Sequence, residues 1–195
     1  MSNFKIAVLA STNGTDLQAI IDEMKAGKMP GVELSVVLSN KECHALQRAR
    51  EQGFEAHYID PEGKSRDEFD REIAEFLGNV DLIVLVGYMR ILSEWFVRRF
   101  ERKIINVHPS LIPKFCGKGF FGSNVHKAVM EAEEKETGMT IFMVDEGCDT
   151  GDIVLQKKCE VEEGDTVDSL KDKVQALEKK WYPEVIRMFS RGEIA

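Results

Sequence analysis

Cysteine and proline are scarce in this chain, which has 4 cysteines and 5 prolines among 195 residues. The cysteines form no C-x-x-C pair and have no histidine partners at zinc-finger spacing, so neither a zinc site nor a disulfide framework is expected. Such usage is typical of a reducing compartment, and we expect a cytoplasmic protein. The cysteines are Cys43, Cys116, Cys148 and Cys159.

Long apolar runs and an excess of positive charge are also missing. No run of about 18 apolar residues could span a membrane, and no charged-then-apolar leader opens the sequence. The 34 acidic residues outnumber the 26 basic ones and give a formal net charge of -8. Nucleic-acid surfaces need clustered Lys and Arg. We therefore expect no membrane or nucleic-acid partner, and an anionic small substrate would be held by local groups such as amides at a helix start.

The remaining composition is that of a globular domain, with 43% hydrophobic and 31% charged residues. A chain of this length can bury most of its apolar surface in one core, without help from disulfides or a structural metal. We therefore expect a single domain over residues 1–195.

Apolar runs alternate with amphipathic stretches through the first two thirds of the chain. Parallel strands need crossover helices, so this order predicts a doubly wound α/β fold with a mostly parallel, Rossmann-like sheet. Two later strands, 139–144 and 153–161, have no helix between them and predict an antiparallel addition near the C-terminus. The other expected strands are 4–10, 32–38, 54–59, 81–86 and 103–107, and the expected helices begin at Leu17 or cover 43–52, 66–77 and 166–189, the last bent near Pro183.

The first polar segment at a predicted strand end is Ser11 to Asp16. Gly14 can adopt a backbone conformation closed to other residues, and the amides of Thr15 and Asp16 could then open a helix and hold a phosphate. Ordinary helix capping by Asn13 or Thr15 is the more common role of such a segment. Both interpretations stay open at this point.

The second segment ends the strand that carries Asn106 and His108. Alternation places both side chains on the same side of the strand, and Pro109 keeps His108 extended so that the strand stops there. An amide donor beside an imidazole suits a developing oxyanion. A half-buried pair that only satisfies loop backbone is an equally good interpretation of the pattern.

The third segment, 145–152, is an acidic loop between two apolar strands. Its four carboxylates indicate either a cation site or solvated turn charges. The ligand spacing rules out an EF-hand. Asx turns at Asp145 or Asp149 are the commonest role for such residues.

Other conspicuous residues have no comparable setting. The glycine cluster 115–122 is expected to be a mobile surface loop. Three histidines are expected at the surface or rim, and several methionines are expected to pack in the core or at its rim. These are His44, His57 and His126, and Met24, Met29, Met130, Met139 and Met143.

Three motifs together resemble the formyl-folate transferases in order and spacing. They are 88–92 (YMRIL), 106–113 (NVHPSLIP), and Gly138-x-Thr140 followed by Asp149-Thr150-Gly151. The likeness extends from about Lys5 to the closing helix. Length favours the branch of this family that formylates glycinamide ribonucleotide in purine biosynthesis, because the other branches carry an extra domain for which this chain has no room.

The resemblance implies an enzyme that uses 10-formyltetrahydrofolate as formyl donor, needs no metal, and acts as a monomer or homodimer. Hydrolysis of formyl-folate and a non-catalytic nucleotide-binding module are the alternatives. By resemblance, the catalytic residues are Asn106, His108 and Asp149; the ribonucleotide contacts are Gly14, Thr15, Asp16, Gln175 and Glu178; and the folate contacts are Met89, Arg90, Ile91, Leu92 and Val144.

The chain departs from the family at three positions. It has Asp16 where Asn is common, Phe142 where His is common, and Asp152 where Pro is common. A charged Asp16 at about 5 Å would oppose a phosphate by roughly 1–3 kcal/mol. We therefore expect Asp16→Asn to tighten ribonucleotide binding unless the side chain points away.

Overall fold

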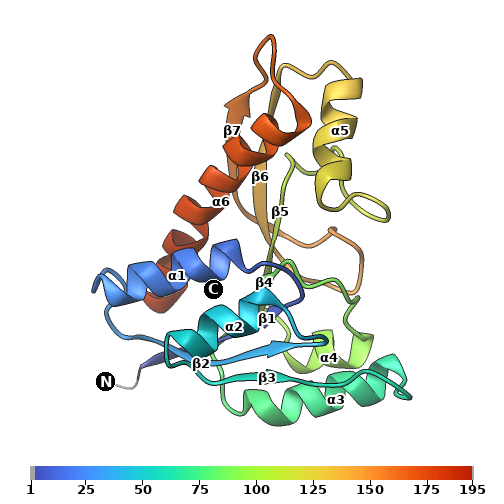
Figure 1. Cartoon of the computed structure of the whole chain (residues 1–195). Coiled ribbons are helices and arrows are strands. Elements are labelled where there is room, and N and C mark those ends of the chain that lie inside the picture. The colour runs from blue at the N-terminus through green and yellow to red at the C-terminus, as the bar shows by residue number, and fades with distance from the viewer. Residues whose placement is uncertain (1–2, 195) are drawn as a thin grey trace.

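The computed structural model describes residues 3–194 and contains a seven-stranded sheet in the order β3-β2-β1-β4-β5-β6-β7 (Figure 1). The pairs from β3 to β5 are parallel, whereas β6 and β7 are antiparallel additions, as the sequence predicts. The strands are β1 (Phe4–Ala10), β2 (Val32–Ser39), β3 (Ala56–Tyr58), β4 (Leu82–Val86), β5 (Ile104–His108), β6 (Glu136–Met143) and β7 (Ile153–Glu160).

Six helices connect or follow the described strands. The expected helix over 66–77 is confirmed without a shift in its bounds, and its start carries a capping box in which Ser65 accepts from the amide of Glu68. The sequence patterns missed α4, which is too short to show several helical turns, and α5, which directly follows the glycine cluster. The helices are α1 (Thr15–Lys25), α2 (His44–Glu51), α3 (Arg66–Leu77), α4 (Glu94–Arg99), α5 (Ser123–Glu131) and α6 (Val167–Ser190).

The sheet is covered on both faces, because its central strands are apolar on both. In β1, Ile6 and Val8 join a core cluster with α1, α2 and α6, while Ala7 and Leu9 join a second cluster with α3 and α4. Such double burial explains why the inner strands read as continuous apolar runs. The doubly wound prediction is confirmed.

Chain order reverses between β1 and β4, which lie side by side in the sheet. Open α/β sheets bind ligands outside the carboxyl ends of the strands at this switch point. The segments that follow β1, β4 and β5 therefore emerge at one edge, because these three strands are parallel neighbours. Gly14 and His108 belong to that same edge.

The closing helix α6 packs on β6 and β7 of the sheet and on the helices α1 and α5 (Figure 1). It begins at a Thr166 cap that accepts from the amide of Ser169, and it continues through Pro183 as one helix to Ser190. Within residues 3–194, no helix combines the length and apolar character needed to cross a membrane.

Candidate active site

The end of β5 presents Asn106 and His108 on one face of the sheet, as alternation predicts. In the antiparallel pairing with β6, Asn106 lies opposite Phe142 and His108 lies opposite Thr140. His108 is buried and Asn106 is half-buried. The strand stops at His108, so both polar groups stand at its tip.

The His108 ring contacts two loops. Its Nε2 donates a 2.7 Å hydrogen bond to the carbonyl oxygen of Phe115. Its Nδ1 lies 3.5 Å from Oδ2 of Asp149, and the two side chains are only 5% and 14% exposed. Because a carbonyl oxygen can only accept, the proton on Nε2 is assigned, and a second proton on Nδ1 would face the carboxylate.

Two carboxylates of the acidic loop, Asp145 and Asp149, make different contacts. Asp145 Oδ1 accepts from the amide of Gly147 and from the Thr150 hydroxyl, so the Asx-turn interpretation is confirmed for Asp145. Asp149 has a φ of 58°, and its Oδ2 accepts a 2.9 Å bond from the amide of Gly117. The turn therefore directs Asp149 toward His108 while Asp145 holds the turn itself.

The glycine cluster 115–122 is part of this site. Phe115 bonds the ring of His108 and Gly117 bonds Asp149, so the start of the cluster links both catalytic candidates. Its expected mobility stays a prediction. The sequence pattern alone showed no reason to connect the cluster with His108.

A buried hydroxyl network fixes the segment after β5. The Thr140 hydroxyl donates to the carbonyl of Ser110 and accepts from the amide of Ile112. Gln156 donates from Nε2 to both Thr140 Oγ1 and the carbonyl of Ile112. Sequence reasoning missed Gln156, whose only signal is its register opposite Thr140 in the β6–β7 pair.

The turn before α1 leaves its amides free of side-chain caps. Gly14 is the N-cap residue with φ 66°, and no side chain caps the helix, so capping by Asn13 or Thr15 is not observed. A Cβ at Gly14 would stand 2.7 Å from Cβ of Ala45, which excludes other residues. Asn13 instead contacts the ring of His44 at 3.2 Å. Free amides at a helix start suit an anion.

Asp16 does not face solvent beside these amides. It is buried, as is Glu178 on α6, the helix that packs on α1. Burial raises the pKa of Asp16 from 3.8 to about 6, although Lys179 lowers it in part. Burial and the neighbouring Asp16 raise the pKa of Glu178 well above its ordinary value. Gln175 is half-buried one turn earlier on α6.

Most of the residues expected to contact the folate, 89–92, lie between β4 and α4. Met89 and Ile91 are exposed, while Leu92 is buried in the same cluster that Val144 packs against. Arg90 lies over the Phe69 ring at 4.4 Å. The expected folate contacts thus offer apolar side chains and backbone at the same sheet edge.

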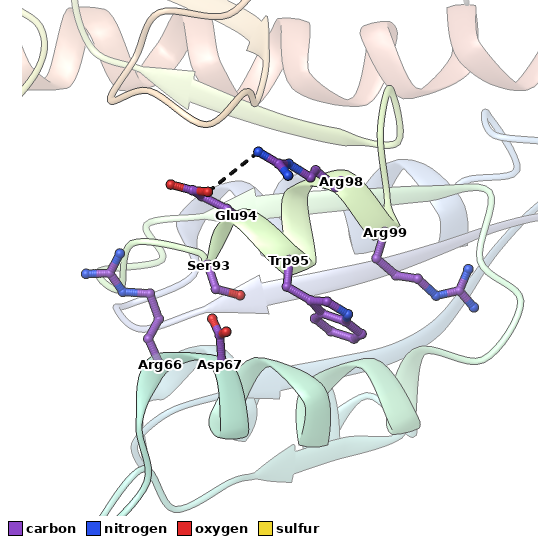
Figure 2. A pocket seen from close by; sticks show the side chains of 7 residues that line it. All are labelled: Arg66, Asp67, Ser93, Glu94, Trp95, Arg98 and Arg99. Carbon is purple, nitrogen blue, oxygen red and sulfur yellow. Dashed lines mark ion pairs between the residues drawn. The ribbon is translucent and has the colours of Figure 1, made fainter.

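Two surface hollows lie near the residues expected to contact the folate. The first lies between α3 and α4 and is lined by Arg66, Asp67, Ser93, Glu94, Trp95, Arg98 and Arg99 (Figure 2). The second is lined by the end of α4 and the residues after it, by Met143 and Val144, and by the acidic loop apart from Cys148 and Asp149. Neither hollow is lined by Asn106 or His108. The candidate site is therefore defined by the strand ends and their contacts, and the hollows lie beside it.

The prediction that all three lone histidines lie at the surface or rim is wrong for His126. Its side chain is 2% exposed on α5, and burial, with Lys171 and His108, lowers its pKa to about 4. It lies among the buried residues of α5, a helix that packs on α6, and the sequence patterns did not show this helix. His44 is exposed and His57 is half-buried, as expected. The described residues contain no cluster of three or more His, Cys, Asp or Glu arranged to hold a metal.

Comparisons with known proteins cover nearly the whole chain. The formyl transferase family model matches residues 4–186. The phosphoribosylglycinamide formyltransferase of Haemophilus influenzae is 38% identical over 194 residues, which cover 97% of this chain and 89% of that protein. Its namesake from Bacillus subtilis is 34% identical over 198 residues, covering 98% and 99%. The crystal structure of glycinamide ribonucleotide transformylase 1 from Symbiobacterium toebii has a TM-score of 0.92 at 38% identity, covering 99% of this chain and 90% of that chain.

Proposed function

The chain belongs to the formyl transferase family, and from that membership we propose that it transfers a formyl group from 10-formyltetrahydrofolate to the amine of glycinamide ribonucleotide. One observation carries the proposal for the site. His108 at the end of β5 meets Asp149 from the acidic loop, on the strand face that also presents Asn106. Phosphate capture alone would not need this arrangement.

The two substrates are proposed to meet at the carboxyl ends of β1, β4 and β5. The ribonucleotide phosphate would rest on the free amides after Gly14, with Gln175 and Glu178 of α6 beside the sugar. The pterin would lie along Met89 to Leu92 and against Val144. Alignment of both substrates in one place can lower the barrier by several kcal/mol.

In the proposed reaction, the substrate amine attacks the formyl carbon and forms a tetrahedral oxyanion. The amide of Asn106 would donate to that oxygen, and His108 in its cationic form would do so from Nε2. The carbonyl oxygen of Phe115 now accepts from this nitrogen, so it marks where an oxyanion could sit once the segment moves aside. Asp149 would stabilise the proton on Nδ1.

Collapse of the intermediate breaks the bond between the formyl carbon and N10 of the folate. The amine must lose a proton and N10 must gain one, so the net transfer is from amine to folate. Asp149 is proposed to assist this transfer through water, with His108 close enough to share the task. The step uses fixed donors that already converge on the strand end.

Release of tetrahydrofolate tests this function directly. The purified protein is mixed with 10-formyltetrahydrofolate, and folate release is followed with and without glycinamide ribonucleotide. We expect release only with the ribonucleotide, together with formation of its formyl amide. Equal release without the amine would instead identify a formyl-folate hydrolase, and binding of the ribonucleotide without any release would identify a non-catalytic nucleotide module.

A further inference from the structure

Two carboxylates are buried on the helices α1 and α6, which pack on each other. Asp16 lies in the first turn of α1 and is 6% exposed, and Glu178 lies in the middle of α6 and is 7% exposed. Both belong to the group of residues proposed to hold the ribonucleotide. A pair of buried acids needs either cations or hydrogen-bond donors, because an isolated buried charge is costly.

Few neighbouring groups supply such a cation or hydrogen-bond donor. Within residues 3–194, Oδ1 of Asp16 is buried and has no hydrogen-bond partner. Tyr182 on α6 is close to both acids, but its hydroxyl donates to the carbonyls of Leu85 and Ile105. The hydroxyl therefore donates to the sheet and not to either acid.

Charged groups on the neighbouring elements do not replace a donor. Lys179 on α6 acts on both acids electrostatically, yet its side chain is exposed to solvent. From α2, Arg48 donates to the carbonyl of Asn13 and to the side chain of Gln18, and the ring of His44 contacts Asn13. These α2 groups hold the turn before α1.

A proton between the two acids removes one buried charge and supplies the missing donor. We propose that Asp16 and Glu178 share one proton and that the ribonucleotide binds to this protonated pair. The second half of the proposal rests on the proposed function. Loss of the proton would place a further negative charge beneath the amides that receive the phosphate, and would weaken binding.

The raised pKa values of both groups support the pair. Burial raises the pKa of Asp16 to about 6, and burial together with Asp16 raises that of Glu178. Because ordinary carboxyl groups are ionised well below neutrality, a proton held here would leave as pH rises through the range in which enzymes are usually assayed. Ribonucleotide affinity should therefore fall with rising pH.

The test compares the native protein with Asp16→Asn, which keeps the shape but cannot ionise. Asp22→Asn is the matched control, because Asp22 is exposed on the same helix. Ribonucleotide affinity is measured by calorimetry from pH 6 to pH 8 in two buffers of different ionisation enthalpy. The ribonucleotide phosphate also titrates, but its contribution is the same for all three proteins and cancels in their ratios.

We expect the affinity of the native protein to fall by about tenfold or more relative to Asp16→Asn across this range, since one linked proton can change affinity up to tenfold per pH unit. Native protein should take up more protons on binding than Asp16→Asn, and Asp22→Asn should follow the native protein. Identical pH profiles and proton uptake for the native protein and Asp16→Asn would overturn the proposal.

A second measurement separates this proposal from the proposed function. Carboxyl carbon chemical shifts of the ligand-free protein are titrated by NMR, and a transition at about pH 6 or above should be present in native protein and altered in Asp16→Asn. Absence of such a transition would refute the shared proton. If the transition is present but no variant binds the ribonucleotide at pH 6, the proposed function fails while the shared proton stands.

Discussion

Nδ1 of His108 lies 3.5 Å from Oδ2 of Asp149, although His108 ends β5 and Asp149 lies in the loop between β6 and β7. The same carboxylate oxygen accepts from the amide of Gly117, whose segment also supplies the carbonyl bonded to Nε2. The imidazole is thus oriented by two loops that lie apart in the sequence. Its orientation depends on both loops at once.

Removal of either member of this pair should slow the chemical step. We expect His108→Ala and Asp149→Asn each to lower kcat by about 10²-fold or more, because each removes stabilisation of charge that develops in the transition state. Ribonucleotide affinity should change much less. Steady-state kinetics and calorimetry measure the two quantities, with His57→Gln on the edge strand β3 as the control. Near-normal turnover in either variant would refute that residue's role.

Asp149→Asn is the more informative of the two variants, because the Asn side-chain oxygen can still accept a hydrogen bond from the amide of Gly117. A loss of turnover in this variant would therefore reflect loss of charge. A matching loss of thermal stability would instead indicate that the loop had been disrupted.

A methyl group at Gly151 should disturb the loop that carries Asp149. A Cβ there would stand 1.7 Å from the carbonyl oxygen of Met143, so the backbone must shift. Because displacement of a catalytic group by about 1 Å can cost about 10²-fold, we expect Gly151→Ala to lower kcat by at least tenfold and to reduce stability. Gly164→Ala is the control for backbone strain without a clash: its φ is 91° but nothing lies near the added Cβ, and it should keep normal turnover because it lies outside the acidic loop. Equal kinetics for both variants would contradict this account.

Tyr182 joins α6 to the two strands that end at the site. Its buried hydroxyl donates to the carbonyls of Leu85 in β4 and Ile105 in β5. Tyr182→Phe leaves both carbonyls without this donor, and we expect the free energy of unfolding to fall by about 1–3 kcal/mol. Urea denaturation measures the change, with the exposed Tyr58→Phe as control. No difference between the two variants would show that the bonds contribute nothing net.

The burial of Asp16 predicts how stability depends on pH. Its pKa is about 6 in the folded protein against an ordinary 3.8, so between these values the folded state binds the proton more tightly than the unfolded chain. The stabilisation is complete at low pH and is lost as pH rises through 6. At about 1.4 kcal/mol per pKa unit, the native protein should lose about 3 kcal/mol by pH 7.5.

Asp16→Asn cannot undergo this loss. We expect it to be more stable than the native protein at pH 7.5 by that amount, with a smaller advantage at pH 5, as measured by urea denaturation at both values. Asp22→Asn should show no such divergence. Parallel stability curves for the native protein and Asp16→Asn would contradict the raised pKa. From the sequence alone, Asp16→Asn was expected to affect only the binding of the ribonucleotide phosphate.

The fold was largely predictable because its signals are local. The strands expected over residues 4–10 and 81–86 correspond to β1 and β4, and the period of residues 66–77 corresponds to α3. Burial of a central strand on both faces imposes an unbroken apolar run, and burial of one helix face imposes a 3.6-residue period. The short helix α4, with six residues, offers too few turns for such a period.

The sequence by itself determined which residue types stand at the strand ends, including Asn106 and His108 on one face of β5. Only the tertiary structure decided their partners. Phe115 and Asp149 meet His108, and α6 buries Asp16 beside Glu178, through contacts between distant segments. Local periodicity reports whether a side chain faces the core or solvent, but a hydrogen bond or a raised pKa depends on which atoms packing brings together from elsewhere in the chain.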